Sequence, residues 1–230
     1  MLKMNRKAYI IIVVTIFFAS CGSRQQRQGE QGSVIEEPSY VQEVPEGWTA
    51  LLDGTTLNGW EIVQYGGEGQ PFMKNGILTL PMAPYGAMTG LTLVDDSFPV
   101  TNYAIYYEAR RVEGNDIFGA MTFPYGDTFA TLIVGGWGGA TCGISSVDDR
   151  DASSNETTKI IHFKDEQWYS IYLHVTPDSI RAVIDDIRVV DLATAGKKIH
   201  LRGGTTADYL TFSTFITTGE IRNLRMKKFD

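Results

Sequence analysis

Residues 103–110 read YAIYYEAR, and residues 168–175 read WYSIYLHV. In the first stretch Tyr103, Ile105 and Tyr107 fall on one side of an extended chain, and the residues between them fall on the other. The odd-numbered positions of the second stretch are likewise apolar. A period of two is typical of a strand with one buried face. We therefore expect both stretches to be strands of a sheet.

Turn signals separate these strands from their neighbours. Asn75-Gly76 lies between two short apolar runs, as a type I′ hairpin turn requires, because both central residues of that turn need a positive φ. Residues 176–179 read TPDS and predict a turn after the second strand. Asp185-Asp186 predicts another turn soon afterwards. No stretch has a convincing helical period, so the sequence predicts an all-β fold, an antiparallel jelly-roll sandwich.

The N-terminus has the features of an export signal. Basic residues precede an uncharged apolar run at 8–18, and Ala19 and Ser20 then lead to Cys21. The apolar run is shorter than the roughly 20 residues of a membrane span. The order resembles a bacterial lipobox, which implies cleavage after residue 20 and a lipid on Cys21. The alternative is an ordinary signal peptide that ends near a cysteine.

The rest of the chain divides into two parts. Residues 21–46 are rich in Gln, Gly, Ser and Glu without apolar periodicity, which is typical of a flexible tether. Residues 47–230 are long enough for one folded domain. We therefore expect a lipid-anchored domain in the cell envelope. Gly22 after the lipidated cysteine favours the outer membrane, with the domain facing the periplasm or the cell surface.

The net charge and the cysteine content restrict the classes of binding partner and the covalent links that the chain can form. The formal net charge is −7, and the signal contains basic residues but no acidic one. An acidic domain argues against nucleic acid as a partner, while the anchor implies a membrane. Cys142 is the only other cysteine and has small neighbours, so we expect a buried side chain and no intrachain disulfide.

Several motifs resemble one known family. They are GWTALLDGTTLNGW at 47–60, KNGIL at 74–78, EGND at 113–116 before Phe118-Gly119, QWY at 167–169 and IDDIRVV at 184–190. Together they resemble the 3-keto-disaccharide hydrolases, formerly domain of unknown function 1080. The resemblance implies a concanavalin-like jelly roll, a carbohydrate or glycoside ligand, and hydrolysis or elimination of 3-keto-glycosides.

The chain departs from that family at one strand. The resemblance implies a strand with acidic and amide side chains after the 113–119 segment, yet residues 129–134 read FATLIV. Asp116 also stands where the family has Ser. Two alternatives to an enzyme therefore remain. One is a carbohydrate-binding lipoprotein without catalysis, and the other is an envelope assembly or adhesion protein with an exposed apolar patch.

The family chemistry needs a base, because a ketone at sugar C3 acidifies the C2 proton and allows the C1 substituent to leave. Glu108 is a candidate base. Tyr106 and Arg110 share its strand face and could stack on a sugar and bind its oxygen atoms. The alternative for Glu108 and Arg110 is a cross-strand ion pair on a solvated face.

A second candidate is Trp137, which stands within GGWGG at 135–139. Four glycines could leave the indole exposed as a platform for a pyranose ring. They could equally permit a tight crossing of strands, with the indole filling the core. The sequence leaves both alternatives open.

The third candidate is the acidic loop SVDDRDASSNE at 146–156. Asp151 and Glu156 are candidate catalytic carboxylates, and Asp148 and Asn155 are candidate sugar ligands. The spacing Asp149-x-Asp151-x-Ser153 could also supply oxygen ligands to a divalent metal such as Ca²⁺, although it does not match an EF-hand. The alternative is a solvated loop. The three histidines lack the spacing of a zinc motif.

Overall fold

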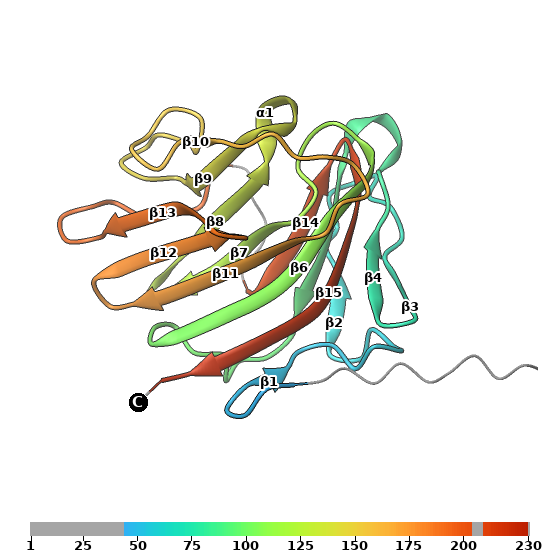
Figure 1. The fold of residues 1–230 in the computed structure, drawn as a ribbon, viewed down its shortest axis with the longest axis horizontal. Coiled ribbons are helices and arrows are strands. Elements are labelled where there is room, and N and C mark those ends of the chain that lie inside the picture. Colours follow the sequence, from blue (N-terminus) through green and yellow to red (C-terminus); the bar gives the residue numbers. More distant parts are fainter. Residues whose placement is uncertain (1–43, 204–208, 230) are drawn as a thin grey trace, which may run out of the picture. The chain divides into compact units, whose positions relative to one another are not determined.

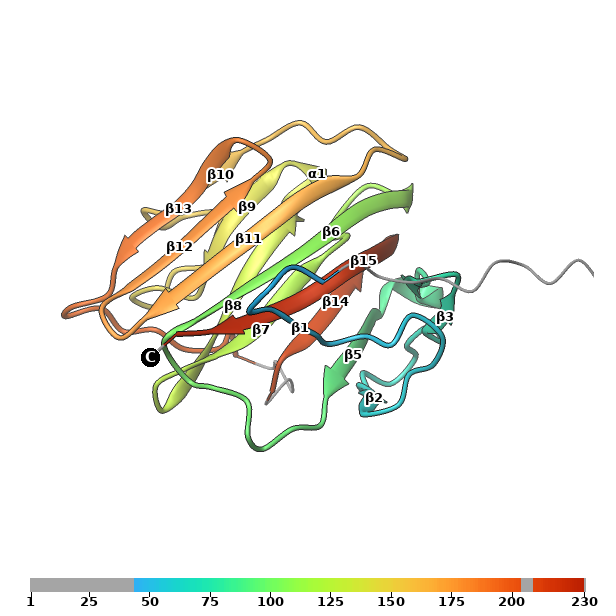
Figure 2. The same cartoon turned by 60° about the horizontal axis from the view of Figure 1, so that its bottom comes forward.

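The structure, a computed structural model, describes residues 44–203 and 209–229. Within this part, two antiparallel sheets pack face to face (Figures 1 and 2). The predicted all-β sandwich is therefore confirmed. The signal at 1–20, Cys21 and nearly all of the tether lie outside the described residues.

The first sheet contains the two stretches with the clearest alternation. Its strands, in spatial order, are β13 (Ile187–Ala193), β12 (Ser179–Ile184), β11 (Tyr169–Thr176), β6 (Tyr103–Gly114), β15 (Thr217–Lys228), β4 (Ile77–Leu80) and β3 (Phe72–Lys74), with β1 (Thr49–Ala50) paired to β15. The long strands β6 and β15 pair along most of their length and form the centre of this sheet.

The second sheet lies behind the first in Figure 1. Its strands, in spatial order, are β10 (Lys159–Ile160), β9 (Thr141–Ser145), β8 (Thr128–Gly135), β7 (Ala120–Tyr125), β14 (Thr211–Phe215), β5 (Met88–Leu93) and β2 (Trp60–Ile62). Among the described residues the helical elements are two single turns, η1 (Pro84–Gly86) and α1 (Gly136–Gly139). Neither of these turns, nor any other helix in the part described, is long and apolar enough to cross a membrane.

The predicted turns lie where the sequence places them. Asn75 and Gly76 have φ values of 49° and 76° and join β3 to β4. The turn at Pro177 and Asp178 joins β11 to β12, whose terminal residues Thr176 and Ser179 are paired. Side-chain chemistry at these turns therefore determines which strands become neighbours in the first sheet.

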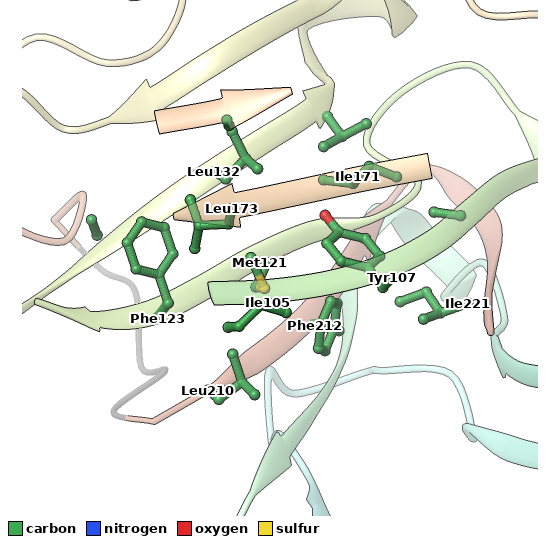
Figure 3. Packing of buried hydrophobic residues seen from close by; sticks show 14 of the residues in the cluster. Ile105, Tyr107, Met121, Phe123, Leu132, Ile171, Leu173, Leu210, Phe212 and Ile221 are labelled. Atoms are coloured by element: carbon green, nitrogen blue, oxygen red, sulfur yellow. The ribbon is translucent and has the colours of Figure 1, made fainter. Parts of the chain in front are cut away.

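The core lies between the sheets, where inward side chains of both layers interdigitate (Figure 3). The inward residues of β6, Tyr103, Ile105 and Tyr107, are fully buried, as their alternation predicts. The Tyr107 ring meets the Phe212 ring edge to face at 5.0 Å, and its hydroxyl donates to the carbonyl of Gly119 at 2.8 Å. Burial of one such side chain stabilises the fold by about 1.5–3 kcal/mol. Cys142 is also buried in this core, as predicted.

Alternation along the second sheet leaves a distinct outer face. In β7, Met121 and Phe123 point into the core, so Ala120 and Thr122 point outward. In β8, Leu132 is in the core. Outward residues of these central strands are small or aliphatic, so the face they share leaves room above it.

Candidate functional site

A hollow of about 260 Å³ lies on the outer face of the second sheet. This volume is just below the range of about 300–1,000 Å³ that is common for small-molecule pockets. The residues around it come from five strands, the α1 turn and three connecting segments. They are Tyr65, Met88, Ile117, Ala120, Thr122, Thr131, Ile133, Trp137, Ser145, Arg202, Gly203 and Ser213.

A row of hydroxyl side chains begins on the floor of this hollow, at Ser145, Thr131 and Thr122, and continues along the same face of the sheet to Thr211 and Thr92. Strand register places Ser145 opposite Thr131, Thr131 opposite Thr122, and Thr122 opposite Thr211, which pairs in turn with Thr92. The Thr122 and Thr131 hydroxyls are 2.8 Å apart, and the Thr211 hydroxyl donates to that of Thr92 at 2.9 Å. Five neighbouring strands thus present oxygen atoms that can both donate and accept.

Tyr65 lies over the β5 side of the floor. A methyl group on Gly90 would come within 2.9 Å of the Tyr65 ring, so the ring lies directly on the Gly90 backbone. The carboxylate of Glu68 accepts hydrogen bonds from the N–H groups of Tyr65, Gly66 and Gly67 at 2.9–3.0 Å and holds this loop. Burial raises the pKa of Tyr65 to about 12, so its hydroxyl stays a neutral donor and acceptor at physiological pH.

Trp137 lies at the opposite side, in α1. The residue is 42% exposed, and its backbone adopts the left-handed conformation with a φ of 49°. For a non-glycine residue this conformation costs on the order of 1–3 kcal/mol and is concentrated at functional sites. Asp116 holds the turn, because its carboxylate accepts from the N–H groups of Gly138 and Ile117 at 2.8 and 2.9 Å. Trp137 thus lies on the surface as part of the lining and does not fill the core, and these were the two alternatives that the sequence left open.

Close packing explains the glycines on either side of Trp137. A methyl group on Gly135 would come within 2.8 Å of the buried Phe118 ring, and one on Gly139 within 2.8 Å of Arg111 and Asn115. Gly135 also has a φ of 74°. The turn is therefore pressed against the body of the sandwich while the indole alone extends outward.

Arg202 completes this side of the hollow. Its guanidinium carbon lies 5.8 Å from the centroid of the Trp137 ring, and its Nη2 atom lies 3.9 Å from Oδ2 of Asp151. A second hollow of about 130 Å³ adjoins the first and is lined by Asp116, Ile117, Trp137, Arg202 and Phe215. Trp137, Arg202 and Ile117 therefore separate two adjacent hollows.

Three of the residues predicted from the sequence lie elsewhere, on the outer face of the first sheet. Glu108 accepts hydrogen bonds from Arg222 at 2.7 Å, Asn223 at 2.8 Å and the Tyr106 hydroxyl at 3.2 Å. Arg110 pairs with Glu220 at 2.7 Å and Glu166 at 3.0 Å. These three residues lie on one face of the first sheet, separated from the hollow by the thickness of the sandwich. As candidate site residues they stay predictions.

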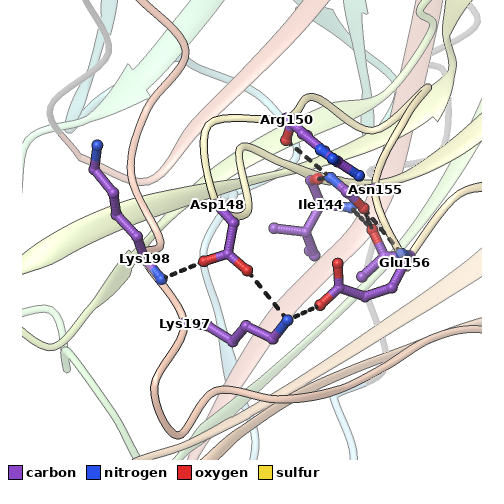
Figure 4. A network of polar contacts seen from close by, with 8 residues as sticks. Ile144, Asp148, Arg150, Asn155, Glu156, Lys197 and Lys198 are labelled. Atoms are coloured by element: carbon purple, nitrogen blue, oxygen red, sulfur yellow. Dashed lines mark hydrogen bonds and ion pairs between the residues drawn. The ribbon is translucent and has the colours of Figure 1, made fainter.

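The acidic loop after β9 is tied to the segment around Lys197 (Figure 4). Lys197 Nζ bridges the carboxylates of Asp148 and Glu156 at 3.1 and 2.5 Å. The Asn155 side chain is buried, donates to the carbonyls of Ile144 and Arg150, and accepts from the Thr157 N–H. Of the predicted loop residues, Asp151 reaches the hollow, because it pairs with Arg202, which lines it.

The oxygen ligands proposed for Ca²⁺ do not fit a metal. Asp149 pairs with the Lys198 ammonium at 2.7 Å, and the same carboxylate oxygen lies 3.0 Å from His200 Nε2, so protein groups already occupy this carboxylate. Oδ1 of Asp151 accepts from the Ser153 hydroxyl at 2.6 Å. Within residues 44–203 and 209–229, no three His, Cys, Asp or Glu side chains are grouped as a metal site would require.

Most of the residues that line the hollow stand in no recognisable sequence motif. Tyr65 and Arg202 stand in irregular segments without a motif, and Thr122 and Thr131 look like ordinary outward residues of strands. Glycines at 66, 67 and 69 around Tyr65 were one available signal of a tight loop. Pairing between distant strands, which the sequence does not show, brings these residues together.

Solved structures similar to this one support the fold. They include a proposed glycosyl hydrolase from Parabacteroides distasonis, with 13% identity over 82% of this chain and 99% of that chain and a TM-score of 0.52. The Crh5 transglycosylase in complex with NAG has 11% identity over 80% of this chain and 85% of that chain, with a TM-score of 0.56. A Bacillus subtilis protein with a galectin-like fold has 9% identity over 75% and 90% of the two chains, with a TM-score of 0.51. At such identities the likeness shows the fold alone.

Sequence comparison identifies the family. No curated protein sequence matches the chain. Residues 47–227 match the family described as the 3-keto-alpha-glucoside-1,2-lyase-like domain, which covers nearly the whole of the predicted domain at 47–230. The resemblance found from the motifs is thus confirmed, and this chain belongs to the 3-keto-alpha-glucoside-1,2-lyase-like domain family.

Proposed function

We propose that this protein binds a carbohydrate in the hollow on the outer face of the second sheet. The observation that carries the proposal is the arrangement of Tyr65 and Trp137 around a floor of hydroxyl side chains. It is supported by membership of a family named for activity on a glucoside.

The arrangement suits the two surfaces of a sugar ring. A pyranose presents C–H groups on its faces, which pack well on an aromatic ring, and the half-exposed Trp137 indole offers such a ring. Hydroxyl groups project from the edges of the sugar and need partners that donate and accept. Thr122, Thr131 and Ser145 line the hollow and supply such partners.

Binding without catalysis is the function that this geometry supports best. The family resemblance implies acidic and amide side chains on the strand that is β8 here. In this chain β8 directs Thr131 and Ile133 into the hollow. These side chains can bind a sugar, but neither is a base at neutral pH.

Hydrolysis or elimination of 3-keto-glycosides is the second candidate, and family membership favours it. A ketone at C3 acidifies the C2 proton, so one carboxylate base near the sugar could remove it and expel the C1 substituent. Among the predicted catalytic residues, Asp151 is the one in contact with the lining, through Arg202. Asp116 lines the adjoining hollow.

We further propose that the protein works in the cell envelope, held by a lipid on Cys21. The support for this is the N-terminal sequence, in which a basic and then an apolar segment precede a cysteine. Labelling of cells with a fatty-acid probe would test it. The wild-type chain should become labelled and a Cys21→Ala chain should not.

Calorimetric titration tests the binding proposal. The purified protein is titrated with glucosides and with their 3-keto derivatives, and each mixture is then assayed for products. Binding of either class that is lost in Trp137→Ala supports the proposal. Turnover that is lost in Asp151→Asn favours the enzyme instead. Absence of binding to every sugar would overturn both.

A further inference from the structure

The charge of the larger hollow comes from one residue. Among the described residues that line it, Arg202 is the only charged side chain, and the others are hydroxyl, aliphatic, aromatic or glycine. The chain as a whole is acidic, with a net charge of −7. A cation at the hollow is therefore opposite in sign to the protein around it.

Arg202 is less committed to protein partners than the neighbouring cations. Its separation of 3.9 Å from Asp151 is the longest among the ion pairs of the described residues, whereas Lys197 and Lys198 pair at 2.5–3.1 Å. The Arg202 side chain is 63% exposed. Asp151 is also engaged, since its Oδ1 atom accepts from the Ser153 hydroxyl. The guanidinium thus keeps donors for a ligand.

Local structure anchors the segment that carries Arg202. The Ser146 N–H donates to the carbonyl of His200 at 2.9 Å, and Val147 and Ile199 form a β-bridge. These contacts join the segment to the end of β9. They place Arg202 where it borders both hollows beside Trp137.

We propose that the hollow takes an acidic carbohydrate, with the carboxylate of a uronic acid residue bound by Arg202. The planar fork of a guanidinium matches a carboxylate and can donate two parallel hydrogen bonds to it. Trp137 then lies beside the ring that bears the carboxylate. The inference rests on the proposed function, because it names the class of ligand for the same site.

The adjoining hollow offers room for a second sugar unit of the ligand. The two hollows share Ile117, Trp137 and Arg202, so a ligand that contacts Arg202 from the first hollow can place a neighbouring unit in the second. The ligand class is therefore an oligosaccharide of two or more units that includes a uronic acid.

Matched ligands test this inference. The purified protein is titrated by calorimetry, in low salt, with a glucuronic-acid-containing disaccharide, its neutral glucose counterpart and a sulfated counterpart. We expect the uronic disaccharide to bind at least about tenfold more tightly than the neutral one, and added salt should reduce this preference. Arg202→Gln should abolish the preference, so that the ratio of the two affinities falls to about one. Arg202→Lys should retain part of the preference.

Arg181→Gln is the matched control. Arg181 is a similarly exposed arginine on β12 of the first sheet, paired with Asp191 at 3.0 Å. The change should leave the preference intact. Equal binding of acidic and neutral disaccharides, a preference for the sulfated ligand alone, or a preference that persists in Arg202→Gln would overturn the inference and leave the proposed function standing. Absence of binding to all three ligands would count against both.

Discussion

The guanidinium carbon of Arg202 lies 5.8 Å from the centroid of the Trp137 ring, at the boundary of two hollows on one face of the sandwich. The two residues are far apart in the chain and come from a turn after β8 and a loop after β13. An arginine beside an indole face restrains the ring, by an interaction of about 0.5–1 kcal/mol at an exposed site. Indole and cation therefore form one surface.

Replacement of Trp137 should separate binding from stability. Trp137→Gly removes the ring and also relieves the left-handed backbone, where φ is 49°. The greater freedom of glycine in the unfolded chain offsets this relief, so the free energy of unfolding should change by less than about 1 kcal/mol. Carbohydrate affinity should fall by at least about tenfold. Urea unfolding and calorimetric titration measure the two effects.

A second tryptophan provides the control. Trp168 lies on the outer face of the first sheet, and its ring centroid is 4.8 Å from the guanidinium carbon of Arg110 and 4.1 Å from that of Arg222. Trp168→Ala should leave carbohydrate affinity unchanged. If it weakened binding as much as the loss of Trp137, the site would not be where we propose.

Gly90 tests the position of Tyr65. A methyl group at Gly90 would lie 2.9 Å from the Tyr65 ring and 3.3 Å from the Phe212 carbonyl, so Gly90→Ala should push the ring away from the floor. We expect a loss of about 1–3 kcal/mol in stability, as for other overpacked sites, together with weaker sugar binding. Gly203→Ala is the control, because Gly203 also lines the hollow but a methyl group there would have no atom of the described residues within 4 Å. Similar binding by the two variants would contradict this packing.

Glu108 should contribute to the stability of the fold and not to sugar binding. Burial opposes its ionisation, but hydrogen bonds from Asn223 and Arg222 outweigh that effect and hold the pKa of Glu108 below its ordinary value. Glu108→Gln should therefore destabilise the protein by about 0.5–1.5 kcal/mol at pH 7, because solvent screens the ion pair and the amide oxygen can still accept hydrogen bonds, and it should leave sugar binding unchanged. Because the folded pKa is depressed, this stabilisation is present above about pH 4.3 and is lost as the pH falls through the folded value. Urea unfolding from pH 7 to pH 3 measures it.

Glu113→Gln on the same strand is the comparison for Glu108, since Glu113 is exposed. Its effect on stability should stay within about 0.5 kcal/mol. Loss of turnover or binding in Glu108→Gln, without loss of stability, would restore Glu108 as a catalytic candidate.

The sequence was informative where one face of a strand is buried. The alternation from Tyr103 to Ala109 predicted the inward residues of β6, and Asn75-Gly76 predicted a hairpin, because burial and positive φ each restrict the residues that a position accepts. The family motifs added the type of sandwich. These are local signals, and each can be interpreted without knowledge of the strand order.

The hollow depends on strand order, which local signals do not contain. Thr122 and Thr131 are close in sequence, but β14 and β5 join them through Thr211 and Thr92 only because distant strands pair. Glu108 and Arg110 attracted notice because charge in a strand is conspicuous. In the fold that charge is neutralised by β15 and neighbouring residues. Charged residues on one face of a strand therefore indicate a binding site less well than does a hollow formed by the pairing of several strands.

Ionisation of Glu68 should make the affinity for a neutral sugar depend on pH in the acidic range. Its carboxylate accepts from its own N–H and from those of Gly67, Gly66 and Tyr65, and these hydrogen bonds lower its pKa. The carboxylate therefore holds the Tyr65 loop down to a pH below the ordinary glutamate range of about 4.3, and its hold is lost as the pH falls through the lowered value. Affinity for the neutral sugar should be constant from pH 7 to about pH 4.3 and should decline below that pH.

Glu68→Gln should remove this dependence. A neutral amide is a weaker acceptor for three N–H groups, so the Tyr65 loop should be looser at every pH and affinity lower already at pH 7. Hydrogen exchange at the amides of residues 65–67 checks the cause without any ligand, because protection there should fall in the variant. Glu61→Gln, at an exposed position of β2, should match the wild type in both measurements. If Glu68→Gln kept both the protection and the affinity of the wild type, the loop would be held by its packing on Gly90 instead.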